Sequence, residues 1–125
     1  MDDFQSIVER RTQLVFPQDA NVLGTLFGGK AVAMMDEVGA IVAMRACRKA
    51  VVTASIDRLD FKEPIRIGEF VEVVARIEKT GRTSMTVLVE LWAEVPATGE
   101  RRLSTTGCFT FVAVDERGRP TPVRP

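Results

Sequence analysis

The chain contains no histidine and no tyrosine among its 125 residues. The absence of histidine excludes Ser-His-Asp and Cys-His catalysis within one chain, and it also excludes His-rich zinc sites. The commonest general base at neutral pH is missing as well. Acid–base or nucleophilic chemistry therefore has to use a carboxylate, a lysine, a cysteine or an activated water, and we expect neither a metal nor another cofactor.

Net charge is also absent, because 17 basic and 17 acidic residues balance. A neutral chain offers no basic surface for nucleic acid, so we expect no nucleic-acid partner. Charged residues interrupt every apolar run well before the roughly 18 residues of a membrane span, which argues against a membrane protein. The start, Met1 to Phe4, lacks a signal-peptide pattern. We therefore expect a cytoplasmic protein with reduced Cys47 and Cys108, and Cys47 is more simply a core residue than a nucleophile.

The pattern of apolar and turn residues predicts one α+β domain over residues 1–125. A single long helix is followed by strands that alternate apolar and polar residues, with Gly- or Pro-containing turns between them. The three prolines after residue 115 indicate an extended or partly disordered tail with little to bury. The predicted elements are a strand at 6–15, a loop at 17–27, a helix at 28–48, a strand at 50–59, a turn at 61–68, strands at 70–79, 82–94 and 101–114, and the tail at 115–125.

Asp36 lies near the middle of the predicted helix, on a face of small and apolar residues. At about 100° per residue its neighbour Glu37 points elsewhere, toward a sector that contains basic residues. An ionised carboxylate on an apolar face is unfavourable unless it is paired or used. Asp36 is therefore either a catalytic group or a structural, paired carboxylate, and the residues alone do not decide between the two.

Several short motifs together resemble the hotdog-fold acyl-CoA thioesterases, in particular the brain-type acyl-CoA hydrolases and their bacterial single-domain relatives. Nearly the whole chain takes part in the resemblance, and a Gly-Gly pair seven residues before Asp36, with an upstream Asn, is its specific part. The motifs are Asp19-Ala20-Asn21, Phe27-Gly28-Gly29, Met35-Asp36-Glu37-Val38, Val52-Thr53-Ala54-Ser55-Ile56-Asp57, Phe109-Thr110-Phe111-Val112-Ala113-Val114-Asp115 and Gly118-Arg119-Pro120-Thr121-Pro122-Val123.

The resemblance implies an antiparallel sheet of about five strands wrapped around one central helix, and hydrolysis of fatty acyl-CoA to a fatty acid and CoA. It implies that Asp36 is catalytic, as nucleophile or general base, and that Asn21 completes the site from a partner subunit. The protein is then at least a dimer, organised as a hexamer (a trimer of dimers) or a tetramer. Backbone N–H groups of Gly28 and Gly29 at the helix start suit an oxyanion hole. The plainer alternative is that these glycines only allow tight packing and that Asn21 only forms a turn.

Cationic and hydroxyl side chains gather at the predicted hairpin between the strands at 70–79 and 82–94, and they suit the phosphates of CoA. A solvated hairpin turn is the plainer interpretation. The candidate CoA residues are Lys79, Thr80, Gly81, Arg82, Thr83 and Ser84, with Arg58 and Lys62 as weaker candidates. Two other functions remain: a non-catalytic acyl-CoA sensor, which ordinarily carries a second domain, and a hotdog dehydratase, which the missing histidines disfavour.

Overall fold

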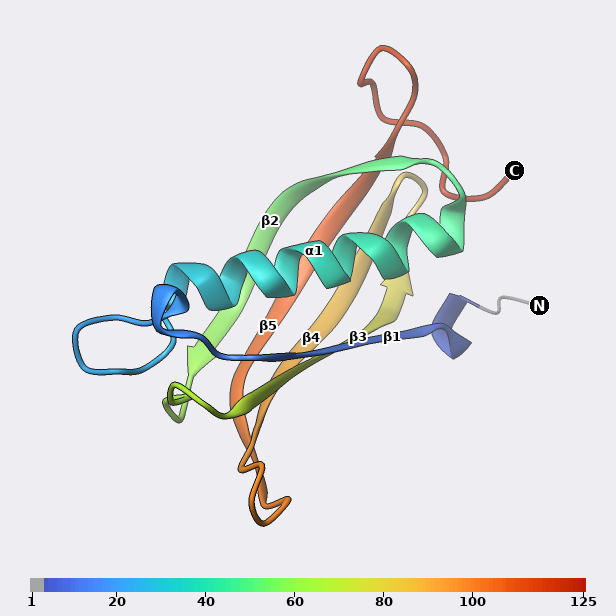
Figure 1. Ribbon diagram of the computed structural model, residues 1–125. Coiled ribbons are helices and arrows are strands. Elements are labelled where there is room, and N and C mark those ends of the chain that lie inside the picture. The colour runs from blue at the N-terminus through green and yellow to red at the C-terminus, as the bar shows by residue number, and fades with distance from the viewer. Residues whose placement is uncertain (1–3) are drawn as a thin grey trace.

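The computed structural model describes residues 4–125, in which one long helix lies across a five-stranded antiparallel sheet (Figure 1). Met1–Asp3, which belong to the stretch that argued against a signal peptide, lie outside the described residues. Helix α1 spans Gly28–Cys47, close to the predicted 28–48. It ends at Arg48, whose backbone is left-handed with φ 58°, and the Arg48 N–H donates to the Met44 carbonyl.

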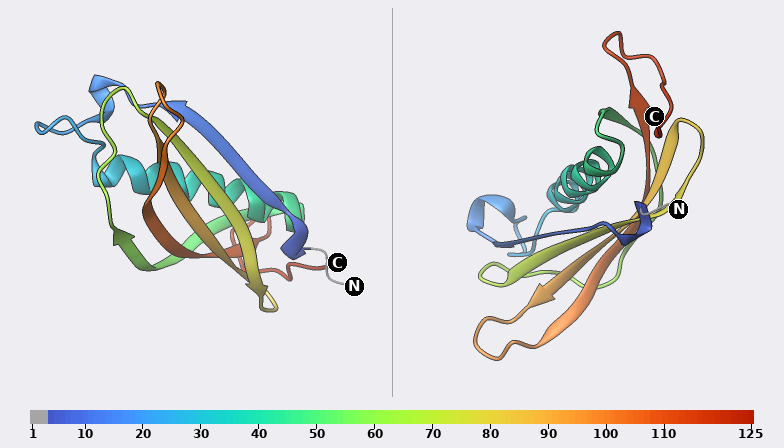
Figure 2. Two further views of the ribbon diagram at one scale, coloured as in Figure 1. Left: turned by 90° about the horizontal axis from the view of Figure 1, so that it is seen from below. Right: turned by 90° about the vertical axis from the view of Figure 1, so that its right-hand side faces the viewer.

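The sheet has the strand order β1-β3-β4-β5-β2, and all pairs are antiparallel. Two short 3₁₀ helices, Phe4–Ser6 and Pro17–Asp19, flank the first strand. The strands are β1 (Val8–Leu14), β2 (Ala50–Phe61), β3 (Phe70–Thr80), β4 (Ser84–Glu94) and β5 (Arg101–Val114). Figure 2 shows the sheet curving around one side of α1, which is the hotdog arrangement that the resemblance implies.

The core lies between α1 and the concave face of the sheet. Alternate residues of β3 and β4 are buried there, as the predicted alternation requires. Gly39 permits a close approach, since a Cβ at this position would lie 3.0 Å from the Phe111 ring. The buried residues of α1 are Ala31, Met34, Met35, Val38, Gly39, Val42, Ala43 and Cys47.

Strand β2 forms an edge of the sheet and is exposed along nearly its whole length. Its register against β5 shifts twice, between Thr53 and Ser55 and between Asp57 and Asp60. An edge strand has unpaired backbone groups that a second chain can use. Large apolar side chains are also exposed along it, namely Val52, Ile56 and Phe61.

The C-terminal tail packs against the sheet more closely than its three prolines suggest. Val123 is only 2% exposed, and its N–H donates to the Arg82 carbonyl at 2.9 Å. The side chain of Arg124 donates to the Thr80 hydroxyl at 3.0 Å and lies over the Phe4 ring. Within residues 4–125, no helix is long and apolar enough to cross a membrane.

Candidate active site

Asp36 pairs with a threonine on the exposed edge strand. The Thr53 hydroxyl donates a 2.6 Å hydrogen bond to Oδ1 of Asp36. The carboxylate is half-buried and faces β2, so it is not sealed inside the core as its small-residue surroundings suggested. The same face of the helix stays open around Asp36, because Gly29 is exposed and Val32 is only half-buried. One oxygen of the carboxylate is therefore fixed while the group stays accessible.

Glu37 points away from Asp36, as the helical phase predicts. It lies on the side of α1 that faces β1, where Arg11 donates to its Oε1 at 2.8 Å. The basic partner comes from β1 and not from the helix itself. Lys30 instead lies 3.4 Å from Asp19, and Arg45 donates to Glu9 at 2.6 Å. Glu37 thus belongs to a surface row of ion pairs that holds β1 against α1.

The start of α1 carries unused backbone donors. The first intrahelical hydrogen bond is donated by Ala31 to Phe27, so the N–H groups of Gly28, Gly29 and Lys30 precede the helical ladder. Among residues 4–125, no side chain caps this end of the helix. A Cβ at Gly29 would meet nothing within 4 Å, so tight packing within the chain does not explain this glycine. The N-terminus is therefore open to an anionic group.

Asn21 shapes the loop that precedes the helix. Its Oδ1 accepts the backbone N–H of Leu23 at 2.9 Å and of Thr25 at 3.1 Å, and its Nδ2 donates to the Thr25 hydroxyl at 2.9 Å. The turn-forming role weighed from the sequence is thus present. Figure 1 shows the loop that contains Asn21 extending beyond the N-terminal end of α1, away from the helix centre. Val22 and Leu23 at its tip are 101% and 81% exposed.

The glycine donors and Asp36 are separated along the helix axis. Gly29 and Asp36 are seven residues apart, which at about 1.5 Å per residue is roughly 10 Å. The helix N–H groups also point toward the N-terminus and away from Asp36. A single thioester carbonyl cannot contact both groups of one chain, since each contact needs about 3 Å. The glycine N–H donors and the Asp36 carboxylate of one chain therefore cannot act on the same thioester carbonyl.

The candidate CoA residues fall into two places. Lys79–Ser84 form the β3–β4 hairpin, at the end of the sheet that carries the C-terminal half of α1 (Figure 1). Gly81 suits this turn, because a Cβ there would lie 2.8 Å from the Ser84 hydroxyl. The Thr83 carbonyl accepts the Ala113 N–H at 2.9 Å, so β5 helps to fix the hairpin.

Arg58 and Lys79 are brought together, whereas Lys62 is not. Arg58 lies in the second register shift of β2 with φ 53°, and it lines a cavity of about 220 Å³ together with Lys79. Asp57 and Glu78 line the same cavity, so its charge is mixed. Lys62 directly follows the C-terminal end of β2, where its N–H donates to the Ser104 carbonyl at 2.7 Å, and it does not line this cavity.

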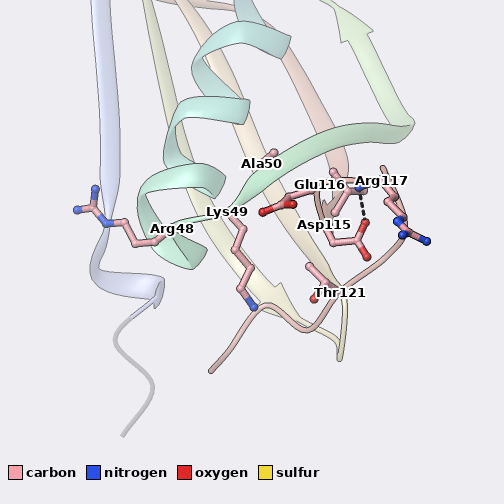
Figure 3. Close-up of a pocket in the computed structure, with 8 residues that line it drawn as sticks. Arg48, Lys49, Ala50, Asp115, Glu116, Arg117 and Thr121 are labelled. Carbon is pink, nitrogen blue, oxygen red and sulfur yellow. Dashed lines mark hydrogen bonds between the residues drawn. The ribbon is translucent and has the colours of Figure 1, made fainter.

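A larger cavity of about 630 Å³ lies at the C-terminal end of α1 (Figure 3). Its charges are mixed, and Arg48 and Arg117 point to opposite sides. Asp115 is occupied locally, because its Oδ1 accepts the N–H groups of Arg117 and Arg119. Asp36 does not line this cavity. We therefore place the chemistry at the small-residue face of α1 and not in the larger opening.

Sequence reasoning missed Thr53 as a member of the site. It recognised the stretch from Val52 to Asp57 but assigned no residue of it a role. Alternation could have placed every second residue of β2 toward the helix. It could not have matched Thr53 to Asp36, because the register shift between Thr53 and Ser55 lies directly beside that contact.

Residues 23–100 match the sequence family described as the Thioesterase superfamily. An uncharacterised acyl-CoA thioester hydrolase, YkhA of Bacillus subtilis, is 43% identical over 113 residues, which are 90% of this chain and 66% of that protein. The acyl-CoA thioester hydrolase YciA of Escherichia coli K12 is 36% identical over 110 residues, covering 86% of this chain and 83% of YciA.

Solved structures have the same fold. An apo-hexameric acyl-CoA thioesterase superposes with a TM-score of 0.91 at 48% identity, covering 94% of this chain and 75% of that one. An acyl-CoA hydrolase of Staphylococcus aureus, bound to butyryl coenzyme A, coenzyme A and coenzyme A disulfide, gives 0.89 at 38% identity and covers 94% and 71%. Variants of that hydrolase have also been solved in which one aspartate, one asparagine and one threonine are each replaced by alanine.

Proposed function

The chain belongs to the thioesterase superfamily, and we propose on that premise that it is an acyl-CoA hydrolase, which splits an acyl-CoA with water into a free acid and CoA. The hydrogen bond from Thr53 to Asp36 carries the proposal. It combines an accessible carboxylate with a group that fixes its orientation, in a chain that has no histidine to act instead.

The spacing of three residues supports the assignment. The asparagine, aspartate and threonine substituted in the S. aureus hydrolase are 15 and 17 residues apart in its own numbering. Asn21, Asp36 and Thr53 are separated by the same intervals here. Because the two chains are 38% identical over 94% of this one, this agreement favours a shared set of working residues.

Asp36 supplies the base or the nucleophile. As a base it removes a proton from water, and the resulting hydroxide attacks the thioester carbon. As a nucleophile it forms an acyl anhydride, which water then hydrolyses. In both routes the C–S bond breaks and the CoA thiolate takes up a proton. The Thr53 hydroxyl orients the carboxylate, and no metal or organic cofactor is needed.

Two chains are needed to complete one site. The N–H groups of Gly28 and Gly29 are roughly 10 Å along the helix from Asp36 of the same chain, so we assign the oxyanion donors to the partner subunit. Asn21 precedes those glycines and comes with them. Its Nδ2 has a second hydrogen besides the one donated to Thr25, and this hydrogen can bind the thioester carbonyl.

The exposed edge strand supports self-association. β2 offers both unpaired backbone groups and exposed apolar side chains, which a second copy would cover. We propose a homo-oligomer, with a hexamer built from dimers as its form, on the strength of the hexameric neighbour.

CoA phosphates are assigned to the Lys79–Ser84 hairpin with Arg58. The two free cysteines fit a cytoplasmic location.

The direct test measures free thiol released from acetyl-, butyryl-, octanoyl- and palmitoyl-CoA by the purified protein. We expect release from at least one of them and near-complete loss in Asp36→Ala at unchanged oligomer size. Oxygen-18 water in a single turnover identifies the nucleophilic route when label appears in the Asp36 carboxylate, because only attack of water on the Asp36 carbonyl of an acyl anhydride places it there. CoA binding without any thiol release would contradict hydrolysis and favour a sensor.

A further inference from the structure

Thr25 contacts Asn21 through both its backbone and its side chain. The Asn21 N–H donates to the Thr25 carbonyl at 2.8 Å, and the Thr25 N–H donates back to Oδ1 of Asn21 at 3.1 Å. The Thr25 hydroxyl accepts a hydrogen from Nδ2 of Asn21 at 2.9 Å, and it lies 3.2 Å from Oδ1. Both the oxygen and the nitrogen of the Asn21 amide are therefore held by one threonine.

This arrangement fixes the direction in which the Asn21 amide points. Oδ1 accepts two backbone N–H groups, from Leu23 and Thr25, so the nitrogen cannot take the place of the oxygen without facing two donors. The Thr25 hydroxyl then fixes the nitrogen, because it binds one of the two Nδ2 hydrogens. The other hydrogen points away from Thr25, and it is the one that binds the thioester carbonyl in the proposed site.

Thr25 is itself held from its other side by residues 64–69, the segment that precedes β3. It forms an isolated antiparallel bridge with Arg66. Two backbone hydrogen bonds flank this bridge, and they run from the Leu26 N–H to the Ile65 carbonyl at 2.7 Å and from the Ile67 N–H to the Gly24 carbonyl at 3.1 Å. Thr25 therefore connects Asn21 to a second segment of the chain.

A nearly buried ion pair anchors that second segment to the sheet. Glu69 is 8% exposed, and its Oε1 accepts the Arg66 N–H at 2.8 Å. Arg102 of β5 donates to both Glu69 oxygens and also to the Pro64 carbonyl at 2.7 Å. Both ends of the segment are thereby tied to β5. Thr25 is thus supported by the sheet, although the tip of its own loop is exposed.

We infer that Thr25 is a positioning residue of the reaction, which directs the free Nδ2 hydrogen of Asn21 toward the thioester carbonyl. The inference rests on the proposed hydrolase function and on the role assigned there to Asn21. Thr25 does not touch the substrate and acts through the amide. The arrangement repeats that of Asp36, whose carboxylate is held by the Thr53 hydroxyl, so each of these two polar side chains has its own threonine.

Two substitutions separate the hydroxyl of Thr25 from the shape of its side chain. Thr25→Val keeps the branched side chain and the backbone hydrogen bonds, but it leaves Nδ2 of Asn21 without its acceptor. With the best acyl-CoA of the panel, we expect kcat to fall by about tenfold, because the amide can rotate away from the carbonyl, and KM to stay within about twofold. Thr25→Ser restores the hydroxyl and should return kcat to within about twofold of the unmodified enzyme.

Mixed oligomers test whether Thr25 acts through Asn21 of its own chain. Asp36→Ala and Asn21→Ala chains are co-expressed with two different tags and purified through both tags. Their working sites combine Asn21 of the first chain with Asp36 of the second. Adding Thr25→Val to the Asp36→Ala chain should lower the restored thiol release by about tenfold. Adding it to the Asn21→Ala chain is the matched control and should change release by less than about twofold, because that chain already lacks Asn21.

A loss confined to the first mixture, together with rescue by serine, would support the inference. Equal losses in both mixtures would overturn it, because a destabilised loop and not the position of Asn21 would then cause the effect. Equal kcat values for Thr25→Val and Thr25→Ser would overturn it as well. A fully active Asn21→Ala would leave Thr25 nothing to position, and so would reject the inference while keeping the hydrolase function. The absence of thiol release by the unmodified protein from every acyl-CoA would reject both.

Discussion

The Thr53 hydroxyl holds Oδ1 of Asp36 at 2.6 Å, and so links the middle of the central helix to an edge strand that is otherwise exposed. The contact leaves the second carboxylate oxygen available for water or substrate. Replacing Thr53 by valine keeps the shape of the side chain and removes the donor. We expect Thr53→Val to lower kcat by about tenfold to a hundredfold, since a misoriented base or nucleophile loses rate steeply.

The informative comparison for Thr53 is Thr53→Ser, which retains the hydroxyl and should keep most of the activity. KM should change little in either variant, because Thr53 is assigned to orient Asp36 and not to bind CoA. Equal kcat values in the valine and serine variants would show that the hydrogen bond has no part in the rate.

The two adjacent acids should behave differently. Asp36→Asn should reduce kcat by at least about a thousandfold, because an amide neither attacks nor accepts a proton. Glu37→Gln removes only a surface ion pair to Arg11, which contributes at most about 1 kcal/mol to stability. Its activity should stay within twofold of the unmodified enzyme. An inactive Glu37→Gln with an active Asp36→Asn would reverse the assignment.

The two-chain site predicts complementation between inactive subunits. Asp36→Ala and Asn21→Ala should each be inactive alone. A mixed dimer would contain one site with both residues intact and one site with neither. Random mixing of equal amounts, by co-refolding, should therefore restore about a quarter of full activity. A mixture that stays as inactive as its components would place both residues in the same chain's site.

Two glycines of α1 provide a contrast between packing and function. Gly39→Ala should destabilise the fold by about 1–3 kcal/mol, because its Cβ would meet the Phe111 ring at 3.0 Å. Gly29→Ala places its methyl group in open space, so the free energy of unfolding should stay the same or rise by up to about 1 kcal/mol. If the Gly29 N–H binds the oxyanion, the added methyl group should still lower kcat.

Urea unfolding and thiol release, measured on both glycine variants, check this contrast. We expect Gly29→Ala to be as stable as the unmodified protein but to release thiol more slowly. Gly39→Ala should be less stable, and its folded molecules should release thiol at the normal rate. A fully active Gly29→Ala would remove this glycine from the oxyanion hole.

The ion pair between Glu69 and Arg102 predicts how stability depends on pH. The Arg102 guanidinium donates to both Glu69 oxygens, at 2.8 and 2.7 Å, and these hydrogen bonds lower the pKa of Glu69 against the opposing effect of burial. Because the pKa of Glu69 is lower in the folded state than its value of about 4.3 in the unfolded chain, the ion pair stabilises the fold fully at pH values above about 4.3. This stabilisation is lost as the pH falls through the folded-state pKa. The protein should therefore lose stability from about pH 5 downward.

Glu69→Gln tests this pH dependence. The variant should be less stable at pH 7 by about 2 kcal/mol, because it removes charged hydrogen bonds from a nearly buried position. Its unfolding free energy should also change less between pH 6 and pH 3 than that of the unmodified protein. Parallel curves for the two proteins would assign the acid sensitivity to other carboxylates.

Local patterns were sufficient for the long helix and the five strands, but they missed the two 3₁₀ helices at Phe4–Ser6 and Pro17–Asp19 and were insufficient for the contacts between elements. The helix and the β5 boundaries follow from small residues, alternation and turn chemistry, all of which act within a few residues. The opposite directions of Asp36 and Glu37 follow from helical geometry alone. The pairing of Thr53 with Asp36 depends on how β2 shifts its register, which short-range patterns do not encode.

The tail and the ion pairs illustrate the same limit. Three prolines correctly exclude a helix or a central strand after residue 115. They do not reveal that Val123 finds a buried place beside the β3–β4 hairpin, because that place is made by residues about forty positions earlier. Glu37 likewise finds Arg11 across the chain and not one of the basic residues on its own helix.

The distance between the start of α1 and Asp36 has a consequence for how the enzyme responds to dilution. In the proposed two-chain site, each chain contributes the donor half of one site and the acid half of another, so a separated chain would have no complete site. Specific activity then follows the fraction of associated subunits. At protein concentrations below the dimer dissociation constant, turnover per chain falls in proportion to dissociation, and an assay at very low enzyme concentration becomes a measurement of assembly.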